Sequence, residues 1–279
     1  MGEWPLGQRP TGVAAKRRIV LLHAHPDDET IATGALIAHF VAQGIAVAVV
    51  TATRGERGEV YPGVLAVDET LLELRERELR RATQVLGVTA HCFLGEPPAR
   101  AKPVPRRYLD SGMRWVTPTL AGPVADAGPQ ALSNADPVEP AADLVAFCRA
   151  WQADALISYD EAGGYGHPDH IACHEIAVTA AQHLGIDCFW IVSDLAGESA
   201  DGNTANASLE RDAARASGEQ AAMPDPSGER FSFDLAGQLD TAKRALACYA
   251  SQLRVDGDEI VHVGGQRDPI VTKVELALH

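Results

Sequence analysis

Two stretches rich in histidine and carboxylate residues each follow a short apolar run in this sequence. The first, HAHPDDET at 23–30, comes directly after the apolar residues 18–22. The second, DEAGGYGHPDH at 160–170, comes directly after the apolar residues 155–159. Because apolar residues at roughly helical spacing follow both stretches, each is predicted to lie where a buried strand ends and a helix begins. In an open α/β sheet, ligands bind at this end of the strands.

Histidine and aspartate side chains in these stretches have the spacing of metal ligands. A catalytic zinc site usually takes three protein ligands and leaves a fourth position for water. His25 and Asp28 are three residues apart across the first junction, and His167 and His170 are three apart across the second. Asp28 alone could equally be a helix N-cap, and a single histidine is more often structural than a ligand. Two such pairs at equivalent positions of a parallel sheet favour a metal site.

The remaining polar residues of the two stretches would have chemical roles beside a bound metal. Asp27 is placed to act as a general base towards water, whose pKa a metal lowers from about 16 to about 7. His167 could bond to an oxyanion or protonate a leaving amine. Tyr165 could donate to the same oxyanion, or simply pack. Asp169 is expected either to orient His167 or His170, or to cap the second helix.

Strands and helices alternate along the chain on both sides of these stretches. The alternation predicts an α/β fold, namely a Rossmann-like, doubly wound and mostly parallel sheet with helices on both faces. The expected strands cover residues 18–22, 45–53, 90–95, 155–159, 188–192 and 270–276, and the expected helices cover about 31–41, 68–86, 137–152, 171–184 and 235–253.

The domain organisation is expected to be simple, with a lead-in segment at 1–16 and a single domain at 17–279. Residues 96–136 show little periodicity, and a long irregular segment inside a compact domain tends to be functional. Long active-site loops are therefore expected. Residues 196–230 contain few large apolar side chains and are expected to form a flexible surface excursion.

Composition and charge exclude several classes of function. The 279 residues are 46% hydrophobic, as in ordinary globular proteins, and the net charge is −14. So acidic a chain is not expected to bind nucleic acid or an anionic membrane, because phosphate groups need basic surface. No apolar run approaches the roughly 20 residues of a membrane span, and residues 1–15 lack an apolar signal core, so a cytoplasmic location is expected. The five cysteines are scattered and predict no disulfide framework.

The two stretches together resemble a known family of enzymes. HPDDE at 25–29 and GGYGHPDH at 163–170 are similar to motifs of the PIG-L/LmbE family of zinc-dependent N-acetylglucosamine deacetylases, and the similarity runs from about Arg18 to about Trp190. Within that family, the sequence is most similar to the N-acetylglucosaminyl-inositol deacetylases of mycothiol biosynthesis. The resemblance implies one zinc ion, with Fe²⁺ as the alternative, held by His25, Asp28 and His170.

Further roles are implied by the resemblance. Asp27 would be the general base, with His167 and Tyr165 around the oxyanion and the leaving group. The resemblance also implies that hydroxyl groups of the sugar and the inositol are held by Arg75, Glu59 and Asp110. Without the resemblance, Arg75 would be a solvent-exposed charge on a helix, and Glu59 and Asp110 would be ordinary loop carboxylates.

Three places in the sequence bear on the choice of substrate. The segment 243–252 is similar to a family segment that normally has histidine where Tyr249 stands. Residues 55–58 are closer to the related mycothiol-conjugate amidase. Gly166 favours the deacetylase, because the amidase tends to have proline at that place.

The resemblance therefore implies hydrolysis of an N-acetyl group on a small-molecule amino sugar, with release of acetate and a free amine. One alternative is a conjugate amidase, or a deacylase of a secondary-metabolite amino sugar, on the same metal site. Another is a sugar-binding protein without catalysis, although such a protein has no need of Asp27. A nucleotide-binding domain is disfavoured, because no G-x-G-x-x-G follows the first strand. The sequence does not indicate an oligomeric state.

Overall fold

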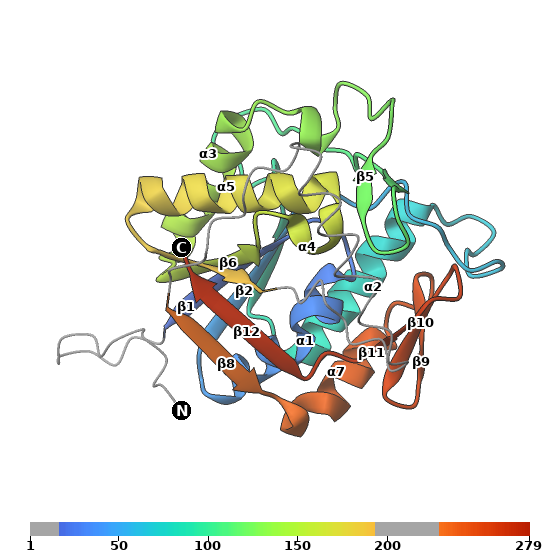
Figure 1. The fold of residues 1–279 in the computed structure, drawn as a ribbon. Coiled ribbons are helices and arrows are strands. Elements are labelled where there is room, and N and C mark those ends of the chain that lie inside the picture. The colour runs from blue at the N-terminus through green and yellow to red at the C-terminus, as the bar shows by residue number, and fades with distance from the viewer. Residues whose placement is uncertain (1–16, 193–228) are drawn as a thin grey trace, which may run out of the picture.

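The centre of the structure, a computed structural model that describes residues 17–192 and 229–279, is a seven-stranded sheet (Figure 1). In spatial order its strands are β3 (Ala90–Phe93), β2 (Ala46–Thr51), β1 (Arg18–His23), β6 (Ala155–Tyr159), β7 (Asp187–Ile191), β12 (Lys273–Leu278) and β8 (Arg230–Asp234). The first five are parallel, and the last two pair antiparallel. The predicted doubly wound, mostly parallel sheet is confirmed.

Helices cover both faces of the sheet, and each face has its own hydrophobic core. Neighbouring side chains of a strand point to opposite faces, so Ile19 of β1 enters one core and Val20 enters the other. The first core includes side chains of α1 (Asp28–Ala42), α2 (Leu71–Leu86) and α7 (Leu239–Leu246), and the second those of α3 (Val138–Trp151) and α5 (Pro168–Leu184). Of the helices that the structure describes, none combines the length and the apolar character needed to cross a membrane.

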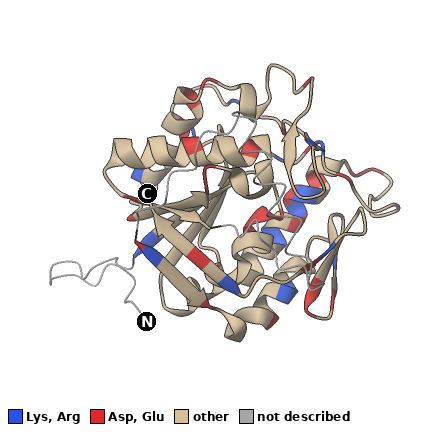
Figure 2. Cartoon of the chain, viewed as in Figure 1, with Lys and Arg blue, Asp and Glu red and all other residues tan. Residues whose placement is uncertain are grey.

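Local signals explain where α2 begins and ends. The Thr70 hydroxyl accepts the backbone N–H of Glu73, and the Glu73 carboxylate accepts the N–H of Thr70, which forms a capping box. The helix therefore begins three residues later than the predicted Asp68. Gly87, at φ 78°, adopts the left-handed conformation that ends many helices. Figure 2 shows acidic and basic residues alternating along this helix.

The irregular segment predicted at 96–136 contains a small hairpin. Strands β4 (Met113–Trp115) and β5 (Ala121–Pro123) pair antiparallel, and the 3-10 turn η1 (Leu132–Asn134) follows them. Such short strands leave too few residues for an alternating pattern, so the sequence did not predict them. A short helical turn, α4 (Gly163–Gly166), precedes α5 and lies beside the hairpin.

The C-terminal region differs from the prediction of one helix over 235–253. The chain instead forms the 3-10 turn η2 (Ala236–Gln238) and then α7, which ends at Leu246. Tyr249 then bonds to a buried carboxylate of α1, and Ser251 to one of α2. These tertiary contacts override the helical pattern of the sequence. The final strand, predicted at 270–276, begins three residues later as β12.

A separate three-stranded antiparallel sheet was also not predicted. It consists of β9 (Leu253–Asp256), β10 (Glu259–His262) and β11 (Arg267–Pro269). The two-residue loop between β9 and β10 is Gly-Asp, with Gly257 at φ 64°, and this is a recognised hairpin signal. The lead-in segment 1–16 and the predicted excursion at 196–230 lie outside the described residues, except that β8 begins at Arg230.

Candidate metal centre

Two loops meet at the carboxyl ends of β1 and β6, because these strands are parallel neighbours in the sheet. The loop after β1 carries His25, and the loop after β6 leads into α5 through His167 and His170. The ring centroid of His25 lies 4.6 Å from that of His167 and 5.5 Å from that of His170. The structure thus brings the two predicted stretches together in one cluster.

Three side chains of this cluster, those of His25, Asp28 and His170, form a set of metal donors. Their ligand atoms all lie within 4.8 Å of one another. Asp28 Oδ2 is 3.0 Å from His25 Nδ1 and 3.2 Å from His170 Nε2. Tyr159 donates its hydroxyl to the same oxygen at 2.9 Å and stacks its ring on His170. The donor set is therefore supported from β6 as well as from its own loops.

His170 Nε2 is a buried nitrogen that forms no hydrogen bond of adequate geometry among the residues described, although Asp28 Oδ2 lies 3.2 Å away. Its other ring nitrogen, Nδ1, lies 3.2 Å from the carbonyl oxygen of Gly163. A proton on Nδ1 donates to that carbonyl, which leaves a free lone pair on Nε2. Buried polar atoms are rarely left unsatisfied, and a metal ion would satisfy this one. The donor set therefore fits a divalent metal ion.

The surroundings of His25 stabilise positive charge. Burial lowers the pKa of His25, but the charge of Asp28 and a hydrogen bond with Asp169 outweigh burial and raise that pKa well above its ordinary value. Burial likewise raises the pKa of Asp28, but His170 and His25 outweigh it and hold the pKa well below its usual range. An ionised carboxylate between two imidazoles is the charge arrangement that a divalent cation prefers.

Asp169 has different partners from those predicted for it. Its Oδ2 accepts the backbone N–H of Ser111 at 2.9 Å and lies 3.2 Å from His25 Nε2. Its Oδ1 accepts the hydroxyl of Ser111. The carboxylate therefore orients His25 rather than His167 or His170, the residues expected from the sequence. The expected helix cap is not Asp169 either, because His167 Nδ1 accepts the backbone N–H of Asp169 at 3.1 Å.

A second group of possible metal donors shares His25 and adds Asp110, His167 and Asp169. Both carboxylates of this group accept hydrogen bonds from backbone, as Asp28 Oδ2 also does from the N–H of His25 at 2.9 Å. Asp110 Oδ1 accepts the N–H of Gly112 at 2.7 Å, and its Oδ2 accepts the N–H of Arg57 at 3.1 Å. Only the set of His25, Asp28 and His170 contains a buried donor without a partner, so this set fits a resident metal better.

Asp27 stands next to the donor set with an unusual backbone. Its φ of 102° lies where residues other than glycine are rarely found, and such strain costs about 1–3 kcal/mol. As N-cap of α1 it makes no capping bond with its side chain. Its carboxylate Oδ2 lies 3.2 Å from Arg75 Nη2. Burial raises the pKa of Asp27 to about 7, against the lowering effect of Arg75, and a cation held alongside would lower it.

Arg75 is buried, and its guanidinium contacts the loop that carries Asp27. Nη2 donates to the carbonyl oxygen of Pro26 at 3.3 Å and to Gln252 Oε1 at 2.7 Å. Gln252 Nε2 in turn donates to the Ser251 hydroxyl, and that hydroxyl donates to Glu78 Oε2 at 2.5 Å. Sequence reasoning missed Gln252, because nothing in the local pattern shows that residues 177 positions apart in the chain bond to each other.

His167 is held so that one ring nitrogen remains available. Because Nδ1 accepts the backbone N–H of Asp169, the neutral ring carries its proton on Nε2. Burial and the neighbouring His25 and His170 lower the pKa of His167 to about 3, which keeps the ring neutral. A neutral imidazole with a proton on Nε2 can donate a hydrogen bond to a developing oxyanion.

The other predicted residues lie at different depths. Tyr165 is half-buried, with its ring centroid 5.1 Å from that of His170, and burial raises the pKa of its hydroxyl well above the ordinary value. Asp110 is buried, with Oδ1 3.7 Å from His25 Nε2. Glu59 is exposed in the loop after β2, and none of the hydrogen bonds or ion pairs found among the described residues joins its side chain to the cluster.

Gly166 precedes His167 in a conformation that proline cannot adopt. Its φ is 88°, whereas the ring of proline fixes φ near −65°. A Cβ at this position would lie 2.6 Å from the carbonyl oxygen of Ala121, in β5. The glycine therefore allows the His167 loop to lie directly against the β4–β5 hairpin.

Comparison with known proteins gives a family match over the region that contains the cluster. The family model "PIG-L: GlcNAc-PI de-N-acetylase" matches residues 20–181. A 1D-myo-inositol 2-acetamido-2-deoxy-alpha-D-glucopyranoside deacetylase of Kribbella flavida is 36% identical over 266 residues, which cover 86% of this chain and 84% of the relative. A protein of the same name from Kineococcus radiotolerans is 45% identical over 166 residues. That match covers 59% of this chain but only 44% of the relative.

Solved structures support the fold. The deacetylase Dbv21, described as acting on the A40926 pseudoaglycone, superposes with a TM-score of 0.54 at 19% identity, covering 85% of this chain and 82% of that protein. A deacetylase of the teicoplanin pathway superposes with a TM-score of 0.53 at 20% identity, covering 84% of each chain. Another structure of a teicoplanin deacetylase is described as a zinc-inhibited form.

Proposed function

The chain belongs to the PIG-L family, and from that premise we propose that it hydrolyses the N-acetyl group of an N-acetylglucosamine derivative. The products are acetate and a free amine. The observation that carries the proposal is the largely buried donor set of His25, Asp28 and His170, with the carboxylate of Asp27, whose backbone is strained, beside it. A protein that only binds a sugar has no need for an unliganded carboxylate at this place.

The metal is proposed to be zinc, with Fe²⁺ as the alternative, held by His25, Asp28 and His170. Two imidazoles and one carboxylate are a common ligand set of catalytic zinc, and they leave a position open. When bound, such an ion polarises a carbonyl group and lowers the pKa of water.

Residues of this chain then account for the proton movements. Asp27 takes a proton from the attacking water, while Arg75 holds its carboxylate in place. The Nε2–H of His167 and the hydroxyl of Tyr165 donate to the oxygen of the acetyl group as it gains negative charge. The proton held by Asp27 passes to the nitrogen as the C–N bond breaks, so that the product leaves as a neutral amine.

The substrate is proposed to carry an inositol or another aglycone on the amino sugar. The relatives from Kribbella and Kineococcus are named for an inositol glycoside of N-acetylglucosamine. Asp110, which is buried beside His25, is proposed to hold a sugar hydroxyl. Glu59 is proposed to reach the aglycone from its exposed loop. For Arg75, the contact with Asp27 supports a role in holding the base rather than the sugar.

A panel of N-acetylated amino sugars, with and without an inositol aglycone, tests the proposal. We expect the zinc-loaded protein to release acetate and amine in equal amounts, and the Asp27→Asn variant to bind metal but lose activity by about 10²- to 10⁴-fold. The panel should include a cysteinyl-glucosamine amide. Cleavage of that amide alone would mean that the protein is a conjugate amidase. If none of the substrates releases an amine, the proposed hydrolysis is refuted.

A further inference from the structure

We propose that Trp115 forms a stacking subsite for the ring attached to the amino sugar, and that this subsite selects glycosides over the free sugar. The proposal rests on the proposed function. Trp115 is the last residue of β4, and half of its surface is exposed (50%). Val116 and Leu120 of the same hairpin are exposed as well, and a contiguous exposed apolar patch marks a surface that binds a ligand or a partner.

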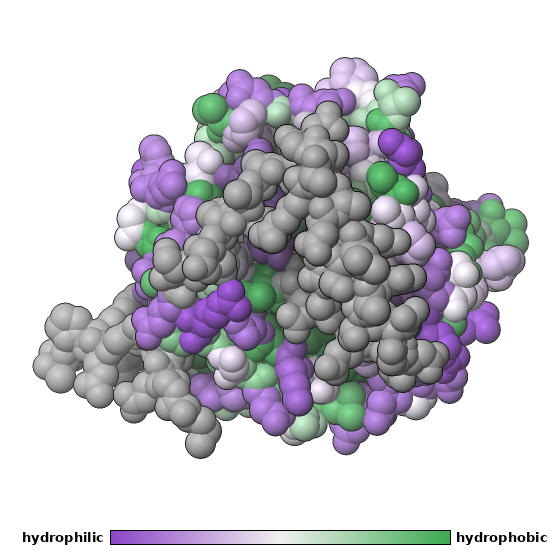
Figure 3. All heavy atoms as spheres, in the orientation of Figure 1, coloured by the Kyte–Doolittle hydropathy of each residue, from purple (hydrophilic) through white to green (hydrophobic). Residues whose placement is uncertain are grey.

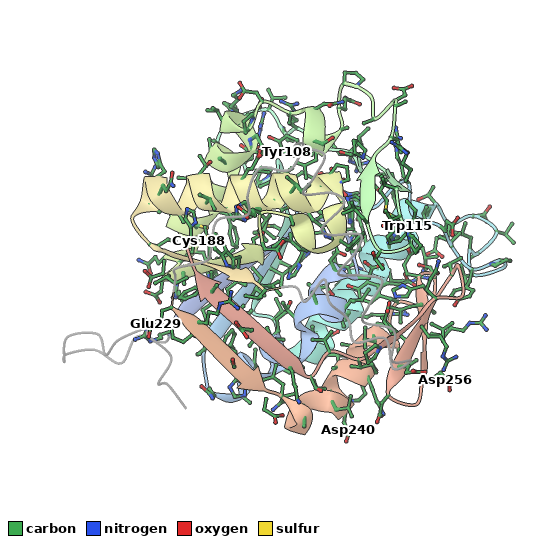
Figure 4. All side chains as sticks on the ribbon, viewed as in Figure 1. Tyr108, Trp115, Cys188, Glu229, Asp240 and Asp256 are labelled. Carbon is green, nitrogen blue, oxygen red and sulfur yellow. The ribbon has the colours of Figure 1, made fainter. Side chains whose placement is uncertain are left out.

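Aromatic rings connect Trp115 to the metal centre. The ring centroid of Tyr165 lies 5.1 Å from that of the metal donor His170 and 5.8 Å from that of Trp115. The planes of Tyr165 and Trp115 are inclined by 30°. Figure 4 shows Trp115 on the side of the molecule where the hairpin stands. A substrate that extends outwards from the metal along Tyr165 therefore reaches Trp115 next.

The hairpin that carries Trp115 is held in a defined position. Trp115 pairs with Ala121 across the hairpin, and the N–H of Val116 donates to the carbonyl oxygen of Leu120 at 2.8 Å. Ala121 and Leu120 also lie so close to Gly166 that no side chain fits there. Because Gly166 directly precedes His167, the hairpin that carries Trp115 is held against the loop of the residue that faces the reacting amide.

The apolar character of the hairpin suits a ring more than a charged group. Trp115, Val116 and Leu120 are three of the seven large hydrophobic residues that are exposed in the described part of the chain. Hydrophobic side chains also reach the surface in Figure 3 on the side where β5 lies in Figure 1. Sugar and cyclitol rings present a face of C–H groups, and such a face packs on an aromatic ring.

The order of the groups places this ring on the sugar side of the scissile bond. The acetyl group is small and ends at the metal centre. His167 and Tyr165 are neighbours, with ring centroids 6.1 Å apart, and His167 faces the amide whose nitrogen carries the sugar. The acetyl group is too short to reach past Tyr165 to the ring of Trp115, whose centroid lies 5.8 Å from that of Tyr165, so the group that reaches Trp115 belongs to the sugar or its aglycone.

The test compares N-acetylglucosamine with its phenyl and inositol glycosides. In Trp115→Ala we expect kcat/KM for the glycosides to fall about tenfold, mainly through KM, while kcat/KM for the free sugar changes less than twofold. Trp115→Phe keeps an aromatic face and should restore most of the difference. Val104→Ala, which removes another exposed apolar side chain, serves as the matched control.

Calorimetric binding to zinc-loaded Asp27→Asn gives a readout that does not depend on turnover. Adding Trp115→Ala should weaken binding of the phenyl glycoside about tenfold and leave binding of the free sugar unchanged. If the parent protein releases no acetate but this difference in binding persists, the proposed function fails and the subsite stands. Equal losses for free sugar and glycosides, or a new preference among N-acyl chain lengths, would overturn the subsite.

Discussion

Asp27 and His170 owe their proposed roles to contacts made by other residues. The carbonyl of Gly163 fixes the proton of His170 on Nδ1, and this leaves Nε2 free for a metal. Arg75 holds the carboxylate of Asp27, and Gln252 holds Arg75. Asp27 and His170 were predicted as site residues from the types and the spacing of residues in the sequence. The sequence could not predict Gln252, because the partner lies in a distant segment.

Replacing Gln252 with leucine tests this positioning at the scale of one residue. The change removes the acceptor at 2.7 Å from Arg75 Nη2 and leaves part of a buried guanidinium unsatisfied. We expect kcat to fall about tenfold, with KM and zinc content little changed, because a hydrogen bond to a charged group contributes about 1.5–3 kcal/mol. Gln252→Glu, which keeps an acceptor, should retain more activity than Gln252→Leu.

Steady-state kinetics with metal analysis checks this expectation. Gln84→Leu, which changes an exposed glutamine of α2, is the control for the substitution itself. Parent-like kcat in a folded Gln252→Leu protein would show that Arg75 keeps its position without Gln252.

At the scale of elements, the sequence predicted the parts that have a strong local pattern. The buried strands β1, β2 and β6 and the helices α1, α3 and α5 lie where periodicity placed them, and so do the two loops of the metal centre. The sequence did not predict the β4–β5 hairpin, whose strands are too short to show an alternating pattern, nor the sheet of β9, β10 and β11. It also did not predict the end of α7, which depends on contacts with distant residues. The hairpin matters for function, because it packs on the loop that carries His167.

Gly166→Ala tests the close contact between this loop and the hairpin. A Cβ would lie 2.6 Å from the carbonyl oxygen of Ala121, so the loop must shift and displace His167. We expect a clear loss of kcat together with a lower melting temperature. Gly185→Ala is the matched control, because Gly185 also has positive φ, at 65°, but has open space around it.

Left-handed strain alone costs about 1–2 kcal/mol in both variants. The comparison of thermal unfolding and kcat for the two proteins therefore isolates the clash at Gly166. Equal losses of stability and unchanged kcat in both variants would contradict a role for the contact in placing His167.

At the scale of the whole molecule, the C-terminal segment completes the support of the metal centre. Strand β12 adds to the parallel sheet, and α7 packs against α1 and α2. The Tyr249 hydroxyl donates to Glu29 Oε1 at 2.6 Å, directly behind the loop of Asp27 and Asp28. This tyrosine stands where the resemblance leads one to expect histidine, and it serves here as a buried partner of α1.

The free energy of unfolding is a property of the whole fold, and we expect His91, in β3, to contribute to its decrease at acidic pH. Burial lowers the pKa of His91 to about 4, below its ordinary value of 6.5. The unfolded chain therefore binds a proton that the folded chain excludes, and stability is lost as pH falls from about 6.5 towards 4. In His91→Gln we expect a smaller loss of stability between pH 7 and pH 5 than in the parent.

Denaturant unfolding at the two pH values measures this difference. His183→Gln, at an exposed position of α5, controls for the removal of a histidine and should keep the parental loss. An unchanged loss of stability in His91→Gln would mean that unfolding does not add a proton to His91 between pH 7 and pH 5, so that the fold does not lower its pKa.

His170 is proposed to hold the metal, and His167 to act on the substrate. Measuring zinc content and acetate release together in His170→Ala and His167→Ala separates these two roles. We predict that His170→Ala loses both zinc and activity. His167→Ala should keep about one zinc per chain and lose about 10²- to 10³-fold in kcat, the typical effect of removing one oxyanion donor. Full zinc content in His170→Ala, or normal turnover in a folded His167→Ala protein, would contradict the account.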